Sequence, residues 1–231
     1  MKTTRNIAIV AAAGSGSRFG SELPKQFQLL GGKPMIVHSL EFFEKQGLVD
    51  EIVLVVSQDY LVYTSQAIVD RYALHKVRKI TAGGETRQES VLAGLSACPA
   101  GIDLVAIHDA ARPFLADDLF RQVMAKGAEN GAAILAVPAS ESLKMAKDGF
   151  VSRTIKRDSI WIAQTPQVFR FESIFEAHQR AEAAHNEASD DSELYEQYCG
   201  PVAIVQGSYK NIKITSPGDF VQAQEIFRGN L

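Results

Sequence analysis

A glycine-rich segment near the N-terminus carries the residue types that bind phosphate. It runs from Ala11 through Gly14 and Gly16 to Arg18, and Lys25 follows a few residues later. Glycine lets the backbone approach a ligand and adopt positive φ, so that successive N–H groups can point at phosphate oxygens. Arginine can hold phosphate through two parallel hydrogen bonds, whereas lysine acts as a compact charge. The combination favours a site for a triphosphate.

The spacing of the glycines distinguishes this loop from two other nucleotide-binding loops. A P-loop ends in Gly-Lys-Ser or Gly-Lys-Thr, and no such ending follows here. Gly14, Gly16 and Gly20 are spaced 1-3-7, whereas the dinucleotide fingerprint requires 1-3-6. The second predicted strand ends in Val55 and Val56 and is followed by Ser57, without the acid that would bind a ribose. A plain tight loop and a dinucleotide-dependent oxidoreductase remain as alternatives at this point.

Nucleotidyl transfer is a reaction that suits two cations beside a glycine loop. Negative charge builds on the α-phosphate as an oxyanion attacks and pyrophosphate leaves, so catalysis is mostly positioning and electrostatic stabilisation. Arg18 and Lys25 are the candidates for this role. Ligands of open α/β sheets bind outside the carboxyl ends of the strands, and the loop directly follows a predicted strand.

The segments that must position the loop alternate between strands and helices. The predicted strands are Asn6–Ala11, Glu51–Val56, Val77–Thr81, Leu104–His108 and Ala132–Val137. The predicted helices between them are Pro34–Gln46, Tyr60–Leu74, Arg87–Ser96 and Asp117–Glu129. This order predicts one α/β domain over residues 1–231, with a mostly parallel sheet and helices on both faces.

The alternation breaks after Pro138. Residues 139–160 hold short polar and β-type pieces around a turn at Asp148 and Gly149, which predicts a hairpin arm too short to form its own core. Because such an arm gains burial on a partner, a twofold dimer is expected. The elements expected after the arm are a helix over Glu172–Ala184, strands over Val202–Val205 and Ile212–Thr215, and a last helix capped by Ser216, with Pro217 at its first position.

An ordered set of motifs resembles one family of nucleotidyltransferases. The motifs are Gly14 to Arg18 with Pro24 to Gln26, Gly83 to Val91, His108 to Pro113, Thr165 to Gln167, and Asn211 to Thr215. Together they resemble the 2-C-methyl-D-erythritol 4-phosphate cytidylyltransferases over nearly the whole chain. Ribitol-5-phosphate cytidylyltransferases share the loop and the Thr-Pro-Gln piece, but Ala110 and Ala111 after Asp109 resemble the first family more. Ala11, Ser142 and Ser189 depart from the proline and threonines that are common in that family.

The resemblance implies a Rossmann-like three-layer fold and a reaction. CTP and 2-C-methyl-D-erythritol 4-phosphate would give the CDP-linked polyol and pyrophosphate, with Mg²⁺ as cofactor. It also implies a homodimer, in which the arm crosses to the neighbouring subunit and Arg157 helps to hold the substrate phosphate.

The resemblance further implies a role for particular residues. The catalytic residues would be Arg18, Lys25, Arg157 and Lys213. The nucleotide-binding residues would be Ala12, Ala13, Gly14, Ser15, Gly16, Gly84 and Ser90, with Gly84 and Ser90 selecting cytosine. The residues around the polyol phosphate would be Asp109, Arg112, Ser142, Arg157, Thr165, Ser189 and Lys213. Asp109 could instead face the metal, and both alternatives stay open.

Composition and charge argue against several other classes of function. The net charge of −3 provides no footprint for nucleic acid or for an anionic membrane. No apolar stretch reaches the roughly 18 residues that a membrane helix needs. Cys98 and Cys199 form no CxxC pair, so reduced thiols and a cytoplasmic protein are expected.

Several other polar and aromatic residues have a structural interpretation. His108 is expected to be a core histidine at a strand end, and Trp161 and Phe169 are expected to serve packing. The acidic run is expected to be the solvated start of a helix, and it comprises Asp190, Asp191 and Glu193.

Overall fold

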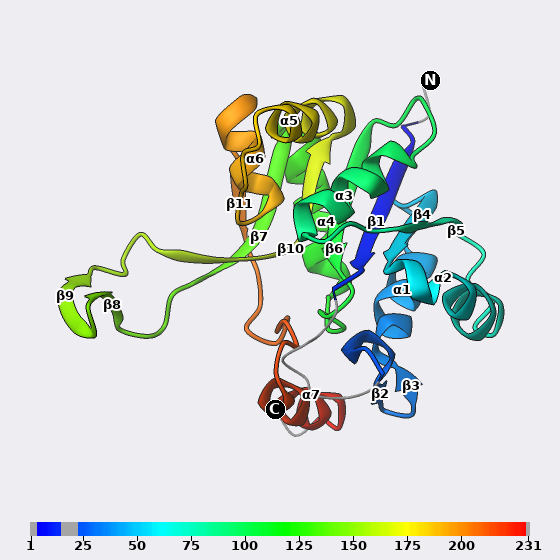
Figure 1. Ribbon diagram of the computed structural model, residues 1–231, viewed down its shortest axis with the longest axis horizontal. Helices are drawn as coiled ribbons and strands as arrows, with labels where there is room; N and C mark the ends of the chain where they lie inside the picture. The colour runs from blue at the N-terminus through cyan, green and yellow to red at the C-terminus, as the bar shows by residue number, and fades with distance from the viewer. Residues whose placement is uncertain (1–3, 15–22, 230–231) are drawn as a thin grey trace.

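The computed structural model describes residues 4–14 and 23–229. Its central sheet has seven strands, β1 (Asn6–Ala12), β4 (Glu51–Val56), β5 (Val77–Ala82), β6 (Leu104–Asp109), β7 (Ala132–Pro138), β10 (Trp161–Arg170) and β11 (Ala203–Gln206). Their order across the sheet is β11-β7-β10-β6-β1-β4-β5 (Figure 1). All neighbouring pairs are parallel except those that β10 makes with β6 and β7. The predicted α/β fold with a mostly parallel sheet is confirmed.

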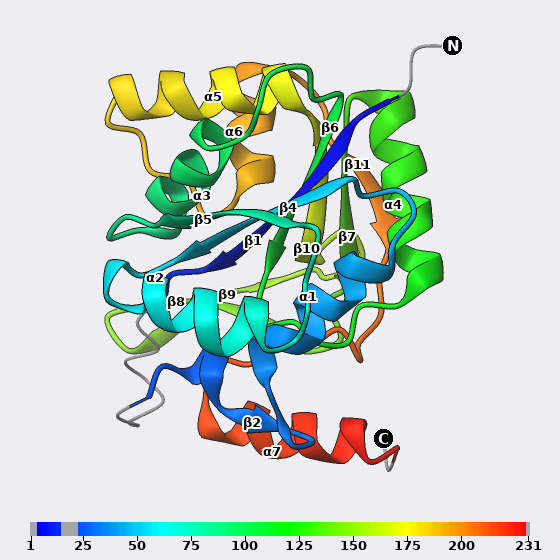
Figure 2. The ribbon, with the colours of Figure 1, turned by 90° about the vertical axis from the view of Figure 1, so that its right-hand side faces the viewer.

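Helices cover both faces of the sheet (Figures 1 and 2). One apolar core includes residues of α1 (Met35–Lys45) and α4 (Asp117–Asn130), and the other includes residues of α3 (Arg87–Ser96), α5 (Phe171–Ala183) and α6 (Asp191–Tyr198). Successive side chains of β1 point to opposite faces of the sheet, so the strand contributes to both cores. Ala8 and Val10 pack on the first core, whereas Ile7 and Ile9 pack on the second. Because β1 is buried on both faces, its sequence is a continuous apolar run.

Two helices begin with the reciprocal hydrogen bonds of a capping box. Ser216 caps α7 (Pro217–Phe227), where Asp219 completes the box and Pro217 occupies the first turn, as predicted. Thr86 caps α3, and the side chain of Glu89 accepts from the Thr86 backbone. The second box fixes the residues just after β5, which the candidate site uses.

Strand β10 was not predicted from the sequence. Its interior contains Pro166, which cannot donate to a ladder and therefore argues against a central strand. The structure accommodates the proline at an irregularity in the pairing with β7, between Gln164 and Gln167. Phe169 lies in this strand and is fully buried, which confirms its packing role, whereas Trp161 at the strand's start is exposed.

Two other predictions need correction. The predicted strand Ile212–Thr215 is wrong, since this segment has no regular structure. It does not form a strand ladder; its Ile214 N–H donates a single backbone hydrogen bond to the Ala111 carbonyl. The predicted helix Tyr60–Leu74 is instead a series of helical pieces that ends at Asp70. These pieces are the 3-10 turn η3 (Gln58–Tyr60), α2 (Leu61–Tyr63) and the π-helical η4 (Thr64–Asp70). Between residue 23 and α1 the described chain contains η2 (Lys25–Phe27), β2 (Leu29–Leu30) and β3 (Lys33–Pro34).

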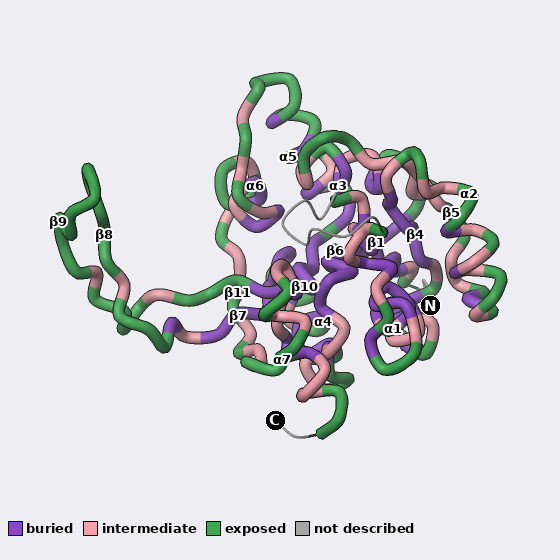
Figure 3. The backbone as a smooth tube through the Cα atoms, turned by 60° about the horizontal axis from the view of Figure 1, so that its bottom comes forward, coloured by how far each residue is buried: buried purple, intermediate pink, exposed green. Residues whose placement is uncertain are grey.

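The arm is a two-stranded hairpin, β8 (Leu143–Lys147) paired antiparallel with β9 (Phe150–Ile155). It projects from the body of the molecule, and almost all of it is exposed (Figure 3). Asp148 and Gly149 form its turn, both with positive φ, as the sequence predicted. Phe150 and Val151 are 79% and 62% exposed, so the arm presents apolar surface that this chain does not cover.

Within the described ranges, no helix is both long enough and apolar enough to cross a membrane.

Candidate active site

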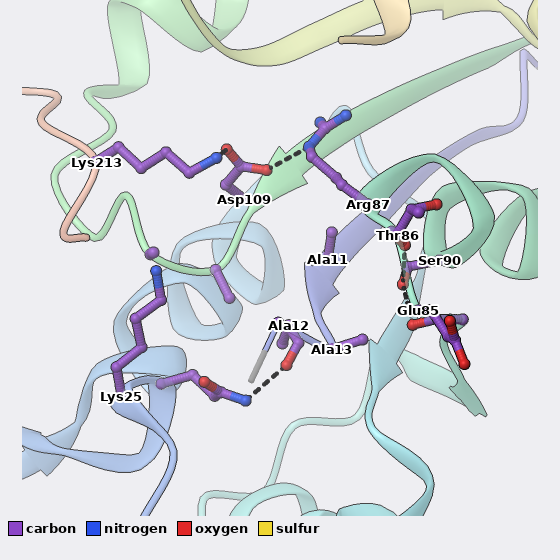
Figure 4. Close-up of a pocket in the computed structure, with 15 residues that line it drawn as sticks. Ala11, Ala12, Ala13, Lys25, Glu85, Thr86, Arg87, Ser90, Asp109 and Lys213 are labelled. Atoms are coloured by element: carbon purple, nitrogen blue, oxygen red, sulfur yellow. Dashed lines mark hydrogen bonds and ion pairs between the residues drawn. The ribbon is translucent and has the colours of Figure 1, made fainter. Parts of the chain in front are cut away.

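A cavity of about 330 Å³ opens at the carboxyl ends of β1, β5 and β6. Ala12, Ala13 and Gly14 line one side of it, where the chain leaves β1. Lys25, Gly84, Ser90, Asp109 and Lys213 also line it, so the fold brings these predicted site residues together (Figure 4). Arg18, Ser15 and Gly16 lie outside the described residues.

Close packing explains the two glycines after β5. A Cβ on Gly83 would come within 2.4 Å of the Ala13 side chain, and one on Gly84 would come within 2.4 Å of Glu89. Ser90 is buried and donates to the Thr86 carbonyl at 2.9 Å. The wall beside Ala13 therefore consists of backbone and short side chains held by the cap of α3. Such a wall can present small hydrogen-bonding groups to a flat ring.

Asp109, at the end of β6, is the centre of a buried charge cluster. Its Oδ1 lies 3.0 Å from Nε of Arg87, and its Oδ2 lies 2.7 Å from Nζ of Lys213. Burial alone would raise the pKa of Asp109. The charges of Arg87, Lys213 and Arg112 outweigh that effect and hold the pKa well below its usual range. Asp109 is therefore ionised and aligns Lys213 at the edge of the cavity.

Arg112 and Thr165 lie behind Asp109 and do not line the cavity. Arg112 is buried, donates to the Asn211 carbonyl at 2.8 Å and lies 4.0 Å from the Asp109 carboxylate. Thr165 accepts the backbone N–H of Asp109 at 3.0 Å. In this structure both residues hold the Asp109 backbone and the segment that carries Lys213.

His108 is a core residue, as the sequence predicted. It is fully buried and its ring packs against Phe43 at 5.3 Å. Burial lowers the pKa of His108 to about 4, so the ring is neutral. Its Nε2 donates to the Arg112 carbonyl at 3.1 Å, and its Nδ1 accepts from the Thr165 hydroxyl at 3.2 Å. These contacts leave it no direct role in the cavity.

Lys25 lies across the cavity from the Asp109 cluster (Figure 4). Its Nζ donates to the Ile214 carbonyl at 3.0 Å. The neighbouring Gln26 is buried and donates to the Ala12 carbonyl at 2.7 Å. Gln26 thus ties η2 to the end of β1, which keeps Lys25 close to Ala12.

Three predicted site residues lie away from this cavity. Ser142 and Arg157 belong to the exposed arm region, where Arg157 donates to the Ser140 carbonyl. Ser189 is exposed before α6 and donates to Glu193 at 2.7 Å through both its backbone and its hydroxyl. Within one chain, the described structure does not bring these residues to the cavity.

Sequence reasoning missed Arg87 and misjudged Asp191. Arg87 stands in the Gly83 to Val91 motif, directly after the Gly-Gly-Glu-Thr run, and that position was a usable signal. Asp191 was expected to be solvated, but it is fully buried and paired with Arg87 and His178. Asp190 does begin α6, since its side chain accepts the Glu193 N–H. The helix start is confirmed and the solvated character of Asp191 is wrong.

The described residues do not form a metal centre of their own. The described part of the chain contains no group of three or more His, Cys, Asp or Glu side chains placed to hold an ion. Asp109 has cations at both of its oxygens. A Mg²⁺ ion held directly by Asp109 therefore does not fit this arrangement.

The mostly parallel sheet, with a cavity at the carboxyl ends of its strands, agrees with one class of enzyme, the nucleotidyltransferases. A family model described as 2-C-methyl-D-erythritol 4-phosphate cytidylyltransferase matches residues 6–229. The chain belongs to this family.

Individual relatives agree with that assignment. The chain is 42% identical over 227 residues to the 2-C-methyl-D-erythritol 4-phosphate cytidylyltransferase of Geobacter metallireducens, covering 97% of this chain and 98% of that one. It is 43% identical over 222 residues to the enzyme of the same name from Pelotomaculum thermopropionicum, covering 96% and 93%. The crystal structure of 4-diphosphocytidyl-2C-methyl-D-erythritol synthase from Anaerococcus prevotii matches with a TM-score of 0.85 at 30% identity, covering 97% and 96%.

Proposed function

We propose that this protein transfers CMP from CTP to 2-C-methyl-D-erythritol 4-phosphate, in the synthesis of isoprenoid precursors. The observation that carries the proposal is the cavity, which joins the end of β1 to Lys25 and to the Asp109–Lys213 pair. Ala13 and Gly14 line the cavity where the chain leaves β1, which suits a triphosphate, and cations on two sides suit two phosphorylated substrates. The oxidoreductase alternative has no support in this geometry.

The reaction needs charge stabilisation and positioning rather than a general base. A phosphate oxygen of the polyol phosphate, already ionised at neutral pH, attacks the α-phosphorus of CTP. A new P–O bond forms, the bond between the α-phosphorus and the bridging oxygen breaks, and pyrophosphate leaves with the electron pair. Lys25 and Arg18 stabilise the charge on the α-phosphoryl group, and Lys213 holds the attacking phosphate.

Mg²⁺ is proposed as the cofactor. This ion prefers oxygen ligands and commonly binds through substrate phosphates with few protein ligands. A triphosphate in the cavity would supply such oxygens. This source suits the chain better than Asp109, whose oxygens are already paired with Arg87 and Lys213.

Cytosine selection is assigned to the wall at Gly84 and Ser90. The wall is closely packed, and its hydrogen-bonding groups belong to backbone and to short side chains. A pyrimidine can be distinguished by a few such bonds, and a purine would overfill a pocket sized for one ring. We therefore expect CTP to exceed ATP by at least about 10²-fold in kcat/KM.

A homodimer is proposed to complete the site. The arm exposes Phe150 and Val151 and has no core of its own, and its Arg157 lies outside the cavity of its own chain. A twofold partner would cover the apolar surface and would place an arm beside each neighbouring cavity. Arg157 and Ser142 would then contact the polyol phosphate bound to the partner chain.

A cytoplasmic location is proposed from the cysteines. Both Cys98 and Cys199 are free thiols in this structure. Burial, together with the nearby charge of Glu51, raises the pKa of Cys98 to about 12, so this thiol is poorly reactive. Free thiols agree with a reducing compartment.

The function is tested by measuring pyrophosphate release from CTP with each polyol phosphate. 2-C-Methyl-D-erythritol 4-phosphate is expected to be preferred over ribitol 5-phosphate by at least about tenfold in kcat/KM, or roughly 1.4 kcal/mol. Mass spectrometry of the product should show the CDP-linked polyol. Equal or reversed preference would contradict the assigned substrate, and no release with either would contradict cytidylyl transfer.

A further inference from the structure

Arg87 connects the active site to a buried carboxylate that the proposed reaction does not use. Its Nε lies 3.0 Å from Oδ1 of Asp109, which faces the cavity. Its Nη2 lies 2.8 Å from Oδ2 of Asp191, at the start of α6. The two carboxylates thus contact different nitrogens of one guanidinium group. Arg87 is the first residue of α3, so its backbone is fixed by the helix cap.

Asp191 is itself held from behind. It is fully buried, and Nε2 of His178 on α5 donates to its Oδ1 at 3.1 Å. Burial would raise the pKa of Asp191, but the charge of Arg87 and the hydrogen bond from His178 lower it, so the side chain is ionised. The start of α6 is also tied to β10, because Ser192 N–H donates to the Gln167 side chain at 3.0 Å.

The division of the Asp109 carboxylate between two cations follows from this arrangement. Arg87 contacts Oδ1, and Oδ2 is left for Nζ of Lys213 at 2.7 Å. A guanidinium with no second partner can bind a carboxylate through two parallel bonds. Without Asp191, Arg87 could therefore take both oxygens of Asp109 and displace Lys213.

We propose that Asp191, supported by His178, is a positioning residue for the reaction, because it restrains Arg87 so that Asp109 keeps Lys213 aligned toward the polyol phosphate. The inference rests on the proposed function. It assigns a role in the site to two buried residues of α5 and α6, neither of which lines the cavity. It predicts that substitution of Asp191 changes the KM for the polyol phosphate. If Asp191 and His178 had only a structural role, their substitution would change the stability of the fold alone.

The test compares Asp191→Asn with wild type in steady-state kinetics for both substrates. The KM for 2-C-methyl-D-erythritol 4-phosphate is expected to rise about tenfold, while the KM for CTP changes less than about twofold. Leu95→Ala is the matched control, because Leu95 is buried further along α3, where it packs in the second apolar core. The control should lower the melting temperature and leave both KM values unchanged.

A double-mutant cycle asks whether Asp191 acts through Lys213. If it does, Asp191→Asn should add less than about twofold to the KM of Lys213→Gln for the polyol phosphate. If Asp191→Asn does not fold, the same measurements are made on His178→Leu, which removes only the donor behind Asp191. That variant is expected to raise the same KM about threefold.

Two results would overturn the inference: an unchanged KM for the polyol phosphate in a folded variant, or an equal rise in both KM values. Fully multiplicative effects in the cycle would also contradict it. Wild type without activity would contradict the proposed function instead. In that case a crystal structure of Asp191→Asn still provides a test, since Arg87 should contact both oxygens of Asp109 and Lys213 should move away.

Discussion

The Asp109 cluster and the arm contrast in how they hold their charged side chains. Asp109 is buried, and Arg87, Lys213 and Arg112 reach it from three separate segments of the chain. Arg157 is exposed on a part of the chain that projects from the body of the molecule, and it donates to the nearby Ser140 carbonyl. The Asp109 cluster is therefore positioned by residues of one chain alone.

The difference indicates what each region needs for function. A buried charge held by several partners is aligned before substrate arrives, which is the condition for electrostatic catalysis. An exposed arginine on an arm loses conformational entropy when it is ordered, and contacts with another surface must offset that loss. We infer that the core supplies a nearly complete half-site and that the arm becomes useful on a partner.

The two regions should differ most in how much a substitution changes the free energy of unfolding. Phe169→Ala removes a fully buried ring from the second core and should cost about 3–5 kcal/mol of unfolding free energy. Phe150→Ser on the arm should change it by less than about 0.5 kcal/mol when measured at concentrations where the protein is monomeric. Urea titration followed by circular dichroism measures both values. A large loss for Phe150→Ser in the monomer would remove the contrast.

Charge at the cavity should control turnover. Lys25→Ala is expected to reduce kcat by ~10²–10³, as when one preorganised stabilising donor is removed. The fold should survive because Lys25 is only partly buried. Lys33→Ala is the control, since Lys33 lies on β3 and pairs with Glu41 away from the cavity lining. Near-normal turnover in folded Lys25→Ala would show that the cation is dispensable.

A smaller effect is expected at the glycine wall. A Cβ on Gly84 would collide with Glu89, so Gly84→Ala must shift the wall and should raise the KM for CTP about tenfold. Gly47→Ala is the matched control, because a Cβ added at Gly47 would meet nothing within 4 Å. Isothermal titration calorimetry with CTP measures the affinity for the nucleotide independently of turnover. Unchanged affinity in Gly84→Ala would place the nucleotide elsewhere.

Much of the fold and of the cavity could be predicted from local patterns. The parallel strands are apolar runs with β-branched residues, and the cap at Ser216 is a short-range signal. Gly84, Ser90, Asp109 and Lys213 follow from the ordered motifs, and the fold does bring them to one cavity.

The missed features depend on contacts between distant segments. Strand β10 contains Pro166, and only its pairing with β7 shows how the proline is accommodated. Asp191 is buried against Arg87, which lies far from it in sequence, and against His178 on the preceding helix. The proposed role of Arg157 depends on a dimer interface and stays a prediction, because one chain alone does not show that interface.

The shared site is tested most directly by mixing two defective subunits. Lys25→Ala damages the core half of the site, Arg157→Ala damages the arm half, and each homodimer should keep less than about 1% of activity. Co-expression with two different tags allows the fraction of mixed dimers to be measured. In a mixed dimer, the core of the Arg157→Ala chain meets the arm of the Lys25→Ala chain and forms one intact site.

With random pairing, about half of the dimers are mixed. Each mixed dimer has one intact site of two, so about a quarter of wild-type activity should be recovered. Activity that stays at the level of the separate variants, in a sample shown to contain mixed dimers, would contradict a site shared between core and arm.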